Sequence, residues 1–247
     1  MIAIESAATV GVNVFMSDPV ELTRRGFVLA LGGVALGGCS TSLDMPDLGL
    51  DLETTGSIRP KISVDKAITD PDVMYASVQE GGFALPAIPY KQVPRQFQRQ
   101  IVQDPTGEAP GTVVVRLAEH HLYLVQEGGD ALRYGVGIGK AGFEWSGRAV
   151  VQYKKEWPVW TPPAEMIARR PDLEKWRGGQ PGGPDNPLGA RALYLFKDGA
   201  DTGYRIHGSP EWRSIGQNMS SGCIRMMNQD VIDLYNRVGP KATVVVA

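Results

Sequence analysis

The chain has 247 residues, of which 43% are hydrophobic, enough for one large domain with a packed core and additional segments. The formal net charge is −2 at pH 7 and no run of basic residues is present, which argues against nucleic acid as a partner. The two cysteines and three histidines have neither the spacing of zinc ligands nor that of a disulfide framework, so no metal or other cofactor is expected.

Residues 23–40 have the pattern of an export signal. Arg24 and Arg25 precede a short apolar run that could not span a bilayer as a mature helix. The arginine pair resembles a twin-arginine signal, and the run ends in Leu-Gly-Gly-Cys, which resembles the lipobox before a lipid-carrying Cys39. The alternative, a buried N-terminal helix, is disfavoured by the glycines in the run. We therefore expect residues 1–39 to be an export signal.

The signal begins unusually far from Met1, whereas a start at Met16 would give a leader of ordinary length. We expect Met16 to be the natural start, or the residues before it to be dispensable. Ser40 directly follows Cys39 and does not resemble the usual inner-membrane retention signal. The predicted location is the periplasm, with a lipid anchor in the outer membrane.

Residues 40–110 differ in composition from the rest of the chain. The part from 40 to about 70 is rich in Pro, Asp, Gly and Thr and has weak hydrophobic periodicity. Such a segment buries too little apolar surface to offset the entropy of ordering, so we expect a tether. Residues 71–103 carry aromatic and aliphatic side chains between prolines, and we interpret them as an extended arm able to pack on the following domain.

Residues 111–247 have the pattern of one mainly β domain. Strands are expected at 112–117, 122–126, 131–138, 148–153, 192–196, 204–207 and 243–246. Their spacing favours antiparallel β structure over βαβ units. Two short helices are expected, one at 164–168 and one that begins with Asn228 as its N-cap and ends before Gly239.

A loop rich in glycine and proline, residues 178–189, interrupts the strand pattern. A long loop inside a compact domain is usually functional or mobile. A lid over a site and a simple surface excursion both fit this pattern.

Cys223 and His207 form the candidate catalytic pair. Cys223 is the only cysteine outside the predicted leader, and His207 is the only histidine outside the pair His120-His121. A thiol becomes a competent nucleophile beside a base, and histidine is the usual base. The turn Ser220-Ser221-Gly222 places consecutive backbone amides next to the thiol, where they could hold an oxyanion. The alternative for a lone cysteine is a buried hydrophobic residue.

These residues resemble the signature of YkuD-like L,D-transpeptidase catalytic domains. The resemblance rests on Ile206-His207-Gly208 and on residues 220–226, and it extends to the segments 135–139 and 186–189. It covers about residues 111–247 and implies a β-sandwich or barrel-like fold. The chain departs from the family pattern at Ser221, where a second histidine is usual, which makes His207 indispensable.

The resemblance also implies a mechanism. Cys223 would attack a carbonyl of a peptidoglycan tetrapeptide stem and expel the terminal D-alanine. His207 would deprotonate the thiol, and the carbonyl of Gly208 would orient the imidazole. The implied oxyanion donors are the backbone amides of Ser221, Gly222 and Cys223. The candidates for substrate contact are Arg225, Ser220 and Asn186.

The acyl acceptor would decide the biological outcome. An amine of another stem peptide gives a 3-3 cross-link, and an amine of an outer-membrane protein anchors that protein to the wall. Water would make the same site an L,D-carboxypeptidase or endopeptidase. A non-catalytic wall-binding lipoprotein is the alternative that Ser221 leaves open. The expected partners are stem peptides, an outer-membrane protein as acceptor, and the membrane through the lipid anchor.

Overall fold

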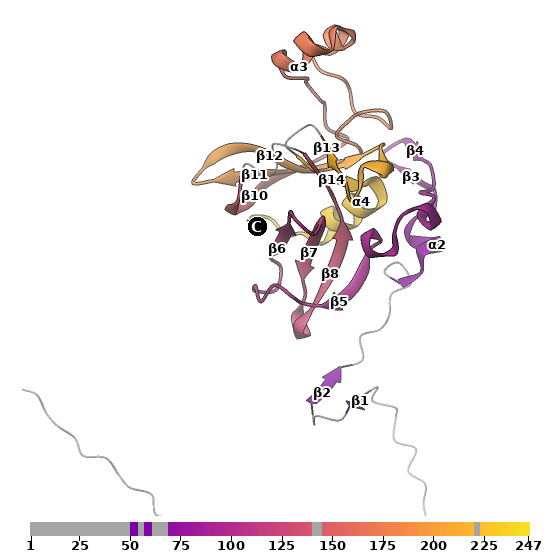
Figure 1. The fold of residues 1–247 in the computed structure, drawn as a ribbon, viewed down its shortest axis with the longest axis vertical. Coiled ribbons are helices and arrows are strands. Elements are labelled where there is room, and N and C mark those ends of the chain that lie inside the picture. The colour runs from indigo at the N-terminus through magenta and orange to yellow at the C-terminus, as the bar shows by residue number, and fades with distance from the viewer. Residues whose placement is uncertain (1–49, 54–56, 61–68, 140–144, 220–222) are drawn as a thin grey trace, which may run out of the picture. The chain divides into compact units, whose positions relative to one another are not determined.

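A computed structural model describes residues 50–53, 57–60, 69–139, 145–219 and 223–247 (Figure 1). Within the predicted tether, β1 (Leu50–Glu53) pairs antiparallel with β2 (Ser57–Pro60). Among the described residues, no helix is long and apolar enough to cross a membrane. The predicted export signal, with Cys39 and both candidate start residues, lies outside the described residues.

The described part of the domain is built on an 11-stranded mixed sheet in the order β13-β9-β14-β12-β11-β10-β15-β6-β7-β8-β5. The strands are β5 (Gln100–Gln103), β6 (Val113–Arg116), β7 (His121–Val125), β8 (Asp130–Gly135), β9 (Gly137–Gly139), β10 (Gly147–Glu156), β11 (Arg191–Lys197), β12 (Ala200–Ser209), β13 (Asn218–Met219), β14 (Ile224–Met227) and β15 (Thr243–Val246). Figure 1 shows β10, β11 and β12 in one layer and β6, β7 and β8 in another.

The mainly β fold is confirmed, with two differences in strand pairing. The predicted strand 131–138 is two strands, because β8 pairs with β7 whereas β9, after Val136, pairs with β14. Three pairs are parallel, namely β12 with β14, β13 with β9, and β15 with β6. Spacing along the chain favoured antiparallel pairs because it reports only on strands that are neighbours in sequence.

The core is formed by the inward side chains of this sheet and by one face of α4 (Asn228–Arg237). Val231 and Leu234 of α4 are buried with Ile206 and Met226, so the helix packs directly behind β12 and β14. Fully burying an aliphatic side chain of this kind contributes about 1.5–3 kcal/mol. The helix therefore fixes the position of the two strands that carry the candidate catalytic residues.

Asn228 is not the N-cap of α4, which corrects the prediction. The N-cap residue is Met227, and Asn228 is the first residue of the helix. The side-chain oxygen of Asn228 accepts a hydrogen bond from the backbone N–H of Ala190 at 2.9 Å instead of capping its own helix. A tertiary contact to the start of β11 has replaced the local one.

The predicted arm is part of the folded sheet. It contains the helix α2 (Pro71–Met74), the hairpin of β3 (Val78–Glu80) and β4 (Phe83–Leu85), two 3₁₀ turns (Tyr90–Gln92 and Arg95–Phe97), and β5. β5 pairs antiparallel with β8 at the edge of the main sheet. Tyr75 and Ile88 are buried in a second core cluster with Ile215 and Met227. Residues 69–103 are thus packed against both α4 and the main sheet.

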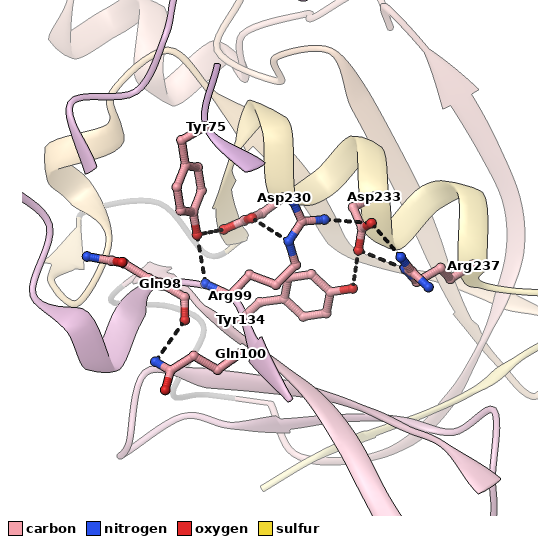
Figure 2. Close-up of polar contacts among 8 residues, drawn as sticks. All are labelled: Tyr75, Gln98, Arg99, Gln100, Tyr134, Asp230, Asp233 and Arg237. Atoms are coloured by element: carbon pink, nitrogen blue, oxygen red, sulfur yellow. Dashed lines mark hydrogen bonds and ion pairs between the residues drawn. The ribbon is translucent and has the colours of Figure 1, made fainter. Parts of the chain in front are cut away.

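A buried polar network joins this arm to α4 (Figure 2). The guanidinium of Arg99 lies 2.5 Å from Asp233 and 3.6 Å from Asp230. The hydroxyl of Tyr75 accepts from the backbone N–H of Arg99 at 2.7 Å and lies 3.4 Å from Asp230. Tyr134 of β8 donates to Asp233 at 2.7 Å. Three elements distant in sequence therefore share one set of hydrogen bonds.

The segment that leaves the sheets is residues 161–179. The residues that flank this segment, Trp160 and Gln180, are joined by two backbone hydrogen bonds. The N–H of Trp160 donates to the carbonyl of Gln180 at 2.9 Å, and the N–H of Gln180 donates to the carbonyl of Trp160 at 2.7 Å. Beyond this pair lie α3 (Ala164–Arg169) and a 3₁₀ helix (Pro171–Trp176), and Figure 1 shows α3 standing clear of the strands. Of the predicted loop 178–189, only residues 178 and 179 belong to this segment, and the others follow the Trp160–Gln180 pair.

Candidate active site

His207 lies in β12 between two neighbouring strands. Its neighbour Ile206 points into the core, and side chains alternate along a strand, so His207 faces the opposite side of the sheet from α4. β12 pairs with β11 and with β14, in a register that places His207 opposite Ala192 and Arg225. Only 4% of the residue is exposed. Backbone pairing on both sides therefore fixes the position of the imidazole.

The hydrogen bond of His207 sets its tautomer. Its Nδ1 atom lies 2.6 Å from the carbonyl oxygen of Gly208, and a carbonyl can only accept, so Nδ1 carries the proton. Nε2 then holds a lone pair and can accept a proton. Burial lowers the pKa of His207 to about 4, and the charges of Arg225 and Arg205 act in the same direction. The imidazole is neutral near pH 7.

Cys223 is half-buried, directly precedes β14, and forms no disulfide with a described residue. Because Ile206 pairs with Ile224, the residue before Ile224 lies level with Arg205. Alternation along β14 places Cys223 on the same face as Arg225, and therefore on the face of His207. The thiol of Cys223 and the imidazole of His207 therefore lie on one face of adjacent strands.

The surroundings of the thiol favour its neutral form. Burial raises the pKa of Cys223, against the lowering effects of a backbone hydrogen bond from Arg205 and the charges of Arg205 and Arg225. The carbonyl of Cys223 accepts from the backbone N–H of Gly139 at 3.2 Å. β9 thus holds the backbone of the candidate nucleophile, which gives a structural role to the segment 135–139.

The predicted oxyanion turn is only in part described. Ser220, Ser221 and Gly222 lie outside the described residues, so their amides remain a prediction. Arg225 is half-buried on β14, opposite His207, where its charge acts on both members of the pair.

Asn186 is fully buried and its side chain is used within its own loop. Its amide nitrogen donates to three backbone carbonyls, those of Pro158, Gln180 and Pro181, and its oxygen accepts from the N–H of Leu188. All of its hydrogen-bonding groups have partners, which favours a role in anchoring the loop 178–189 over direct contact with a substrate.

Two residues of the site were missed by sequence reasoning. Arg205 precedes His207 by two residues and therefore shares its face, a signal that alternation along the predicted strand could have provided. Asn228 packs against Gly208, where an added Cβ atom would collide with its side-chain oxygen. No local pattern indicated this contact. Within the described ranges, no group of three His, Cys, Asp or Glu side chains could hold a metal ion.

Comparison with known proteins identifies the family of the chain. The model of the YkuD family, the L,D-transpeptidase catalytic domain, matches residues 110–246. A protein of Escherichia coli named as the probable L,D-transpeptidase YbiS is 35% identical over 147 residues, which are 57% of this chain and 45% of that protein. The probable L,D-transpeptidase ErfK/SrfK of Salmonella typhimurium is 35% identical over 145 residues, 57% of this chain and 44% of that protein.

The chain therefore matches less than half of the length of these two relatives. A solved structure from Brucella melitensis, described as a probable carnitine operon oxidoreductase caia, is 45% identical, with a TM-score of 0.44. The match covers 61% of this chain and 94% of the Brucella melitensis chain. Because the family model spans more than half of the 247 residues, this chain belongs to the YkuD family of L,D-transpeptidase catalytic domains.

Proposed function

We propose that the protein is a peptidoglycan L,D-transpeptidase with Cys223 as nucleophile and His207 as general base. The observation that carries the proposal is the register of β12 and β14, which places both side chains on one face of adjacent parallel strands. Membership of the YkuD family supports the reaction class. The substrate is the tetrapeptide stem, by analogy with the family.

In the first half-reaction, Sγ of Cys223 bonds to the carbonyl carbon of the third stem residue while its proton passes to Nε2 of His207. The carbon–nitrogen bond to the terminal D-alanine then breaks, and His207 returns the proton to the departing amine. A thioester remains on Cys223. The hydrogen bond to Gly208 keeps the imidazole in the tautomer that this transfer requires.

The resting pair is a neutral thiol and a neutral imidazole. Burial raises the pKa of Cys223 and lowers the pKa of His207 to about 4, so formation of an ion pair is unfavourable before substrate binds. The proton therefore moves as the carbon–sulfur bond forms. Backbone amides at 221–223 would then stabilise the oxyanion, a contribution of about 3 kcal/mol for each donor.

In the second half-reaction, an amine attacks the thioester carbonyl and loses its proton to His207, and Cys223 leaves as the thiol. We propose that this amine belongs to a second stem peptide or to an outer-membrane protein. Export by a twin-arginine signal and lipidation at Cys39 would hold the domain in the periplasm. Residues 40 to about 70 would let it reach the wall, at about 3.3 Å per extended residue.

The test uses the chain without its export signal and disaccharide-tetrapeptides from peptidoglycan, with products identified by mass spectrometry. We expect release of D-alanine and formation of 3-3 linked dimers by the wild type, and neither product with Cys223→Ala. Release of D-alanine without dimers, even when protein amines are supplied, would favour the carboxypeptidase alternative. Full turnover by Cys223→Ala would refute the mechanism.

A second measurement separates an active from a degenerate site. Carbapenems acylate cysteines of the family, so we expect an adduct of one carbapenem on Cys223 of the folded domain. Lack of an adduct on the wild type, together with lack of turnover, would leave the non-catalytic wall-binding alternative.

A further inference from the structure

Two rows of side chains cross the face of the sheet that carries Cys223. In the first row Tyr153 of β10 pairs with Tyr194 of β11, which pairs with Arg205 of β12, and Cys223 is level with Arg205. The second row lies two residues farther along each strand, and its paired residues are Lys155, Ala192, His207 and Arg225. The candidate catalytic pair thus lies on the same face of the sheet as these residues, at the end of two rows that reach β10. Figure 1 shows β10, β11 and β12 side by side.

The orientation of β10 confirms that its part of the rows faces outward. Lys154 lies between Tyr153 and Lys155, and its ammonium group donates to the carbonyls of Tyr235 and Val238 on and beside α4. Side chains alternate along a strand, so Tyr153 and Lys155 point to the opposite side from α4. This is the side of His207.

The first row is a stacked set of aromatic and cationic groups. The rings of Tyr153 and Tyr194 stack with centroids 4.3 Å apart and an interplanar angle of 22°. The guanidinium carbon of Arg205 lies 4.4 Å from the centroid of Tyr194. Asp201 holds Arg205 in this position through two hydrogen bonds of 2.7 Å. The aromatic groups are therefore fixed before any ligand binds.

Lys155 adds an accessible positive charge to this row. Its ammonium group lies 5.8 Å from the ring centroid of Tyr153 and 5.6 Å from that of Tyr194, and the side chain is exposed. Tyr153 is itself 40% exposed. In the described part of the chain Lys155 makes no ion pair with a carboxylate. An exposed ammonium beside a stacked pair of tyrosines is complementary to a ligand that has both a carboxylate and a ring or apolar face.

The spacing relates this surface to the reaction. Three interstrand steps separate β14 from β10, which is about 14 Å at 4.8 Å for each step. A peptide extended from the acylated carbon covers this distance in about four residues at 3.3 Å each. The three stem residues before the scissile bond extend about 10 Å, so the sugar attached to them is the part of the donor that extends as far as Tyr153 and Lys155.

We propose that Tyr153, Lys155, Tyr194 and Arg205, the tyrosine–lysine surface, bind the acyl donor as an acidic glycopeptide. Lys155 pairs with a carboxylate of the glycopeptide, and the exposed ring of Tyr153 packs against the sugar or the peptide of this ligand. Arg205 links this surface to the thiol. The inference rests on the proposed function, since it assigns the subsite that holds the donor while Cys223 reacts.

The test is equilibrium binding of a disaccharide-tetrapeptide to the Cys223→Ala protein, measured by calorimetry. Lys155→Glu is expected to weaken binding at least about tenfold, and Tyr153→Ala several-fold. Lys91→Glu is the matched control, because Lys91 is also an exposed lysine, 6.0 Å from the ring of Tyr90, but in the arm. It is expected to bind like the parent. Thermal unfolding of each variant verifies that it is folded.

A chemical variant of the ligand tests the charge pairing itself. Amidation of the stem carboxylates is expected to weaken binding to the parent protein at least about tenfold and to have a much smaller effect on Lys155→Glu. Equal affinities of Lys155→Glu, Tyr153→Ala and Lys91→Glu would overturn the inference, as would lack of measurable binding to the parent.

The outcome is separable from that of the proposed function. Acyl transfer by the wild type together with unchanged binding by Lys155→Glu would retain the transpeptidase and reject the tyrosine–lysine surface. Weakened binding by Lys155→Glu together with no acyl transfer by the wild type would retain the surface and reject the catalytic role.

Discussion

The side-chain oxygen of Asn228 accepts a hydrogen bond from the backbone N–H of Ala190 at 2.9 Å, in the interior of the domain. The same oxygen lies against Gly208, at a position where an added Cβ atom would collide with it. The carbonyl of Gly208 in turn orients His207 at 2.6 Å. The first turn of α4 is therefore connected to the imidazole through one glycine.

Asn228→Ala is expected to slow acylation of Cys223 at least about tenfold. The substitution leaves the buried N–H of Ala190 without an acceptor, at a cost of about 1–3 kcal/mol, and removes the support behind Gly208. The measurement is the second-order rate of adduct formation with a carbapenem, followed by mass spectrometry. Asn228→Asp, which keeps the acceptor oxygen, is expected to lose less activity.

Gln229→Ala is the control for this prediction. Gln229 is also a buried polar residue of α4, but its amide donates to the carbonyls of Ala76 and Pro86 in the arm. It is expected to lower the free energy of unfolding without a comparable loss of rate. Equal rates for Asn228→Ala and Gln229→Ala would show that Asn228 acts only through stability.

The low pKa of His207 predicts a broad pH plateau for acylation. The neutral imidazole is the active form, and burial lowers its pKa to about 4, so the rate should fall only as the pH drops through about 4. A base of ordinary pKa would lose activity already near pH 6.5. The measurement is the carbapenem acylation rate from about pH 4 to 8, with fluorescence as a check on folding. An inflection near pH 6.5 would contradict the buried neutral histidine.

Much of this domain was predictable because its signals are local. Alternating apolar residues indicated β6, β7, β10, β11 and β15, and the scarcity of cysteine and histidine indicated the candidate catalytic pair. The contacts that were missed join distant segments, such as Asn228 with Ala190 and Arg99 with Asp233. Periodicity describes which face of an element is buried but not which partner covers it, and for this reason the role of the arm was underestimated.

The pKa of Asp230 predicts an unusual pH dependence of stability. Burial raises this pKa to about 7, although Arg99 acts to lower it. Between about pH 4 and 7 the folded protein keeps the proton that the unfolded chain has lost, so this carboxyl destabilises the fold progressively as the pH rises. His207 acts oppositely, because its lowered pKa makes the fold more stable as the pH rises from about 4 to 6.5. The two effects largely offset each other in the wild type.

Asp230→Asn is expected to reveal the contribution of His207. The free energy of unfolding of Asp230→Asn minus that of the wild type should increase between pH 4 and 8 by up to about 4 kcal/mol. This is the equivalent of about three pKa units. Urea unfolding at several pH values provides the measurement. A difference between variant and wild type that is independent of pH would contradict the raised pKa of Asp230.

Asp233→Asn is the matched control on the same helix. Hydrogen bonds from Arg237, Tyr134 and Arg99 outweigh the effect of burial and hold the pKa of Asp233 below its ordinary value. This carboxylate is therefore ionised in the folded protein. It stabilises the folded state at pH values above the pKa that an aspartate has in the unfolded chain. Asp233→Asn should destabilise the protein near pH 7, where Asp230→Asn does not.

Removal of residues 1–68 is expected to leave a folded domain, whereas removal of residues 1–103 is expected to prevent folding. The longer deletion takes away β5, Tyr75 and Arg99, which exposes the edge of β8 and leaves the ionised Asp233 without the guanidinium of Arg99. Loss of one member of a buried ion pair alone costs about 3–5 kcal/mol, a large part of the stability of a typical domain. Circular dichroism and thermal unfolding of both truncated proteins provide the comparison. A cooperative transition of the shorter protein at the temperature of the longer one would show that the arm is only an accessory to the catalytic domain.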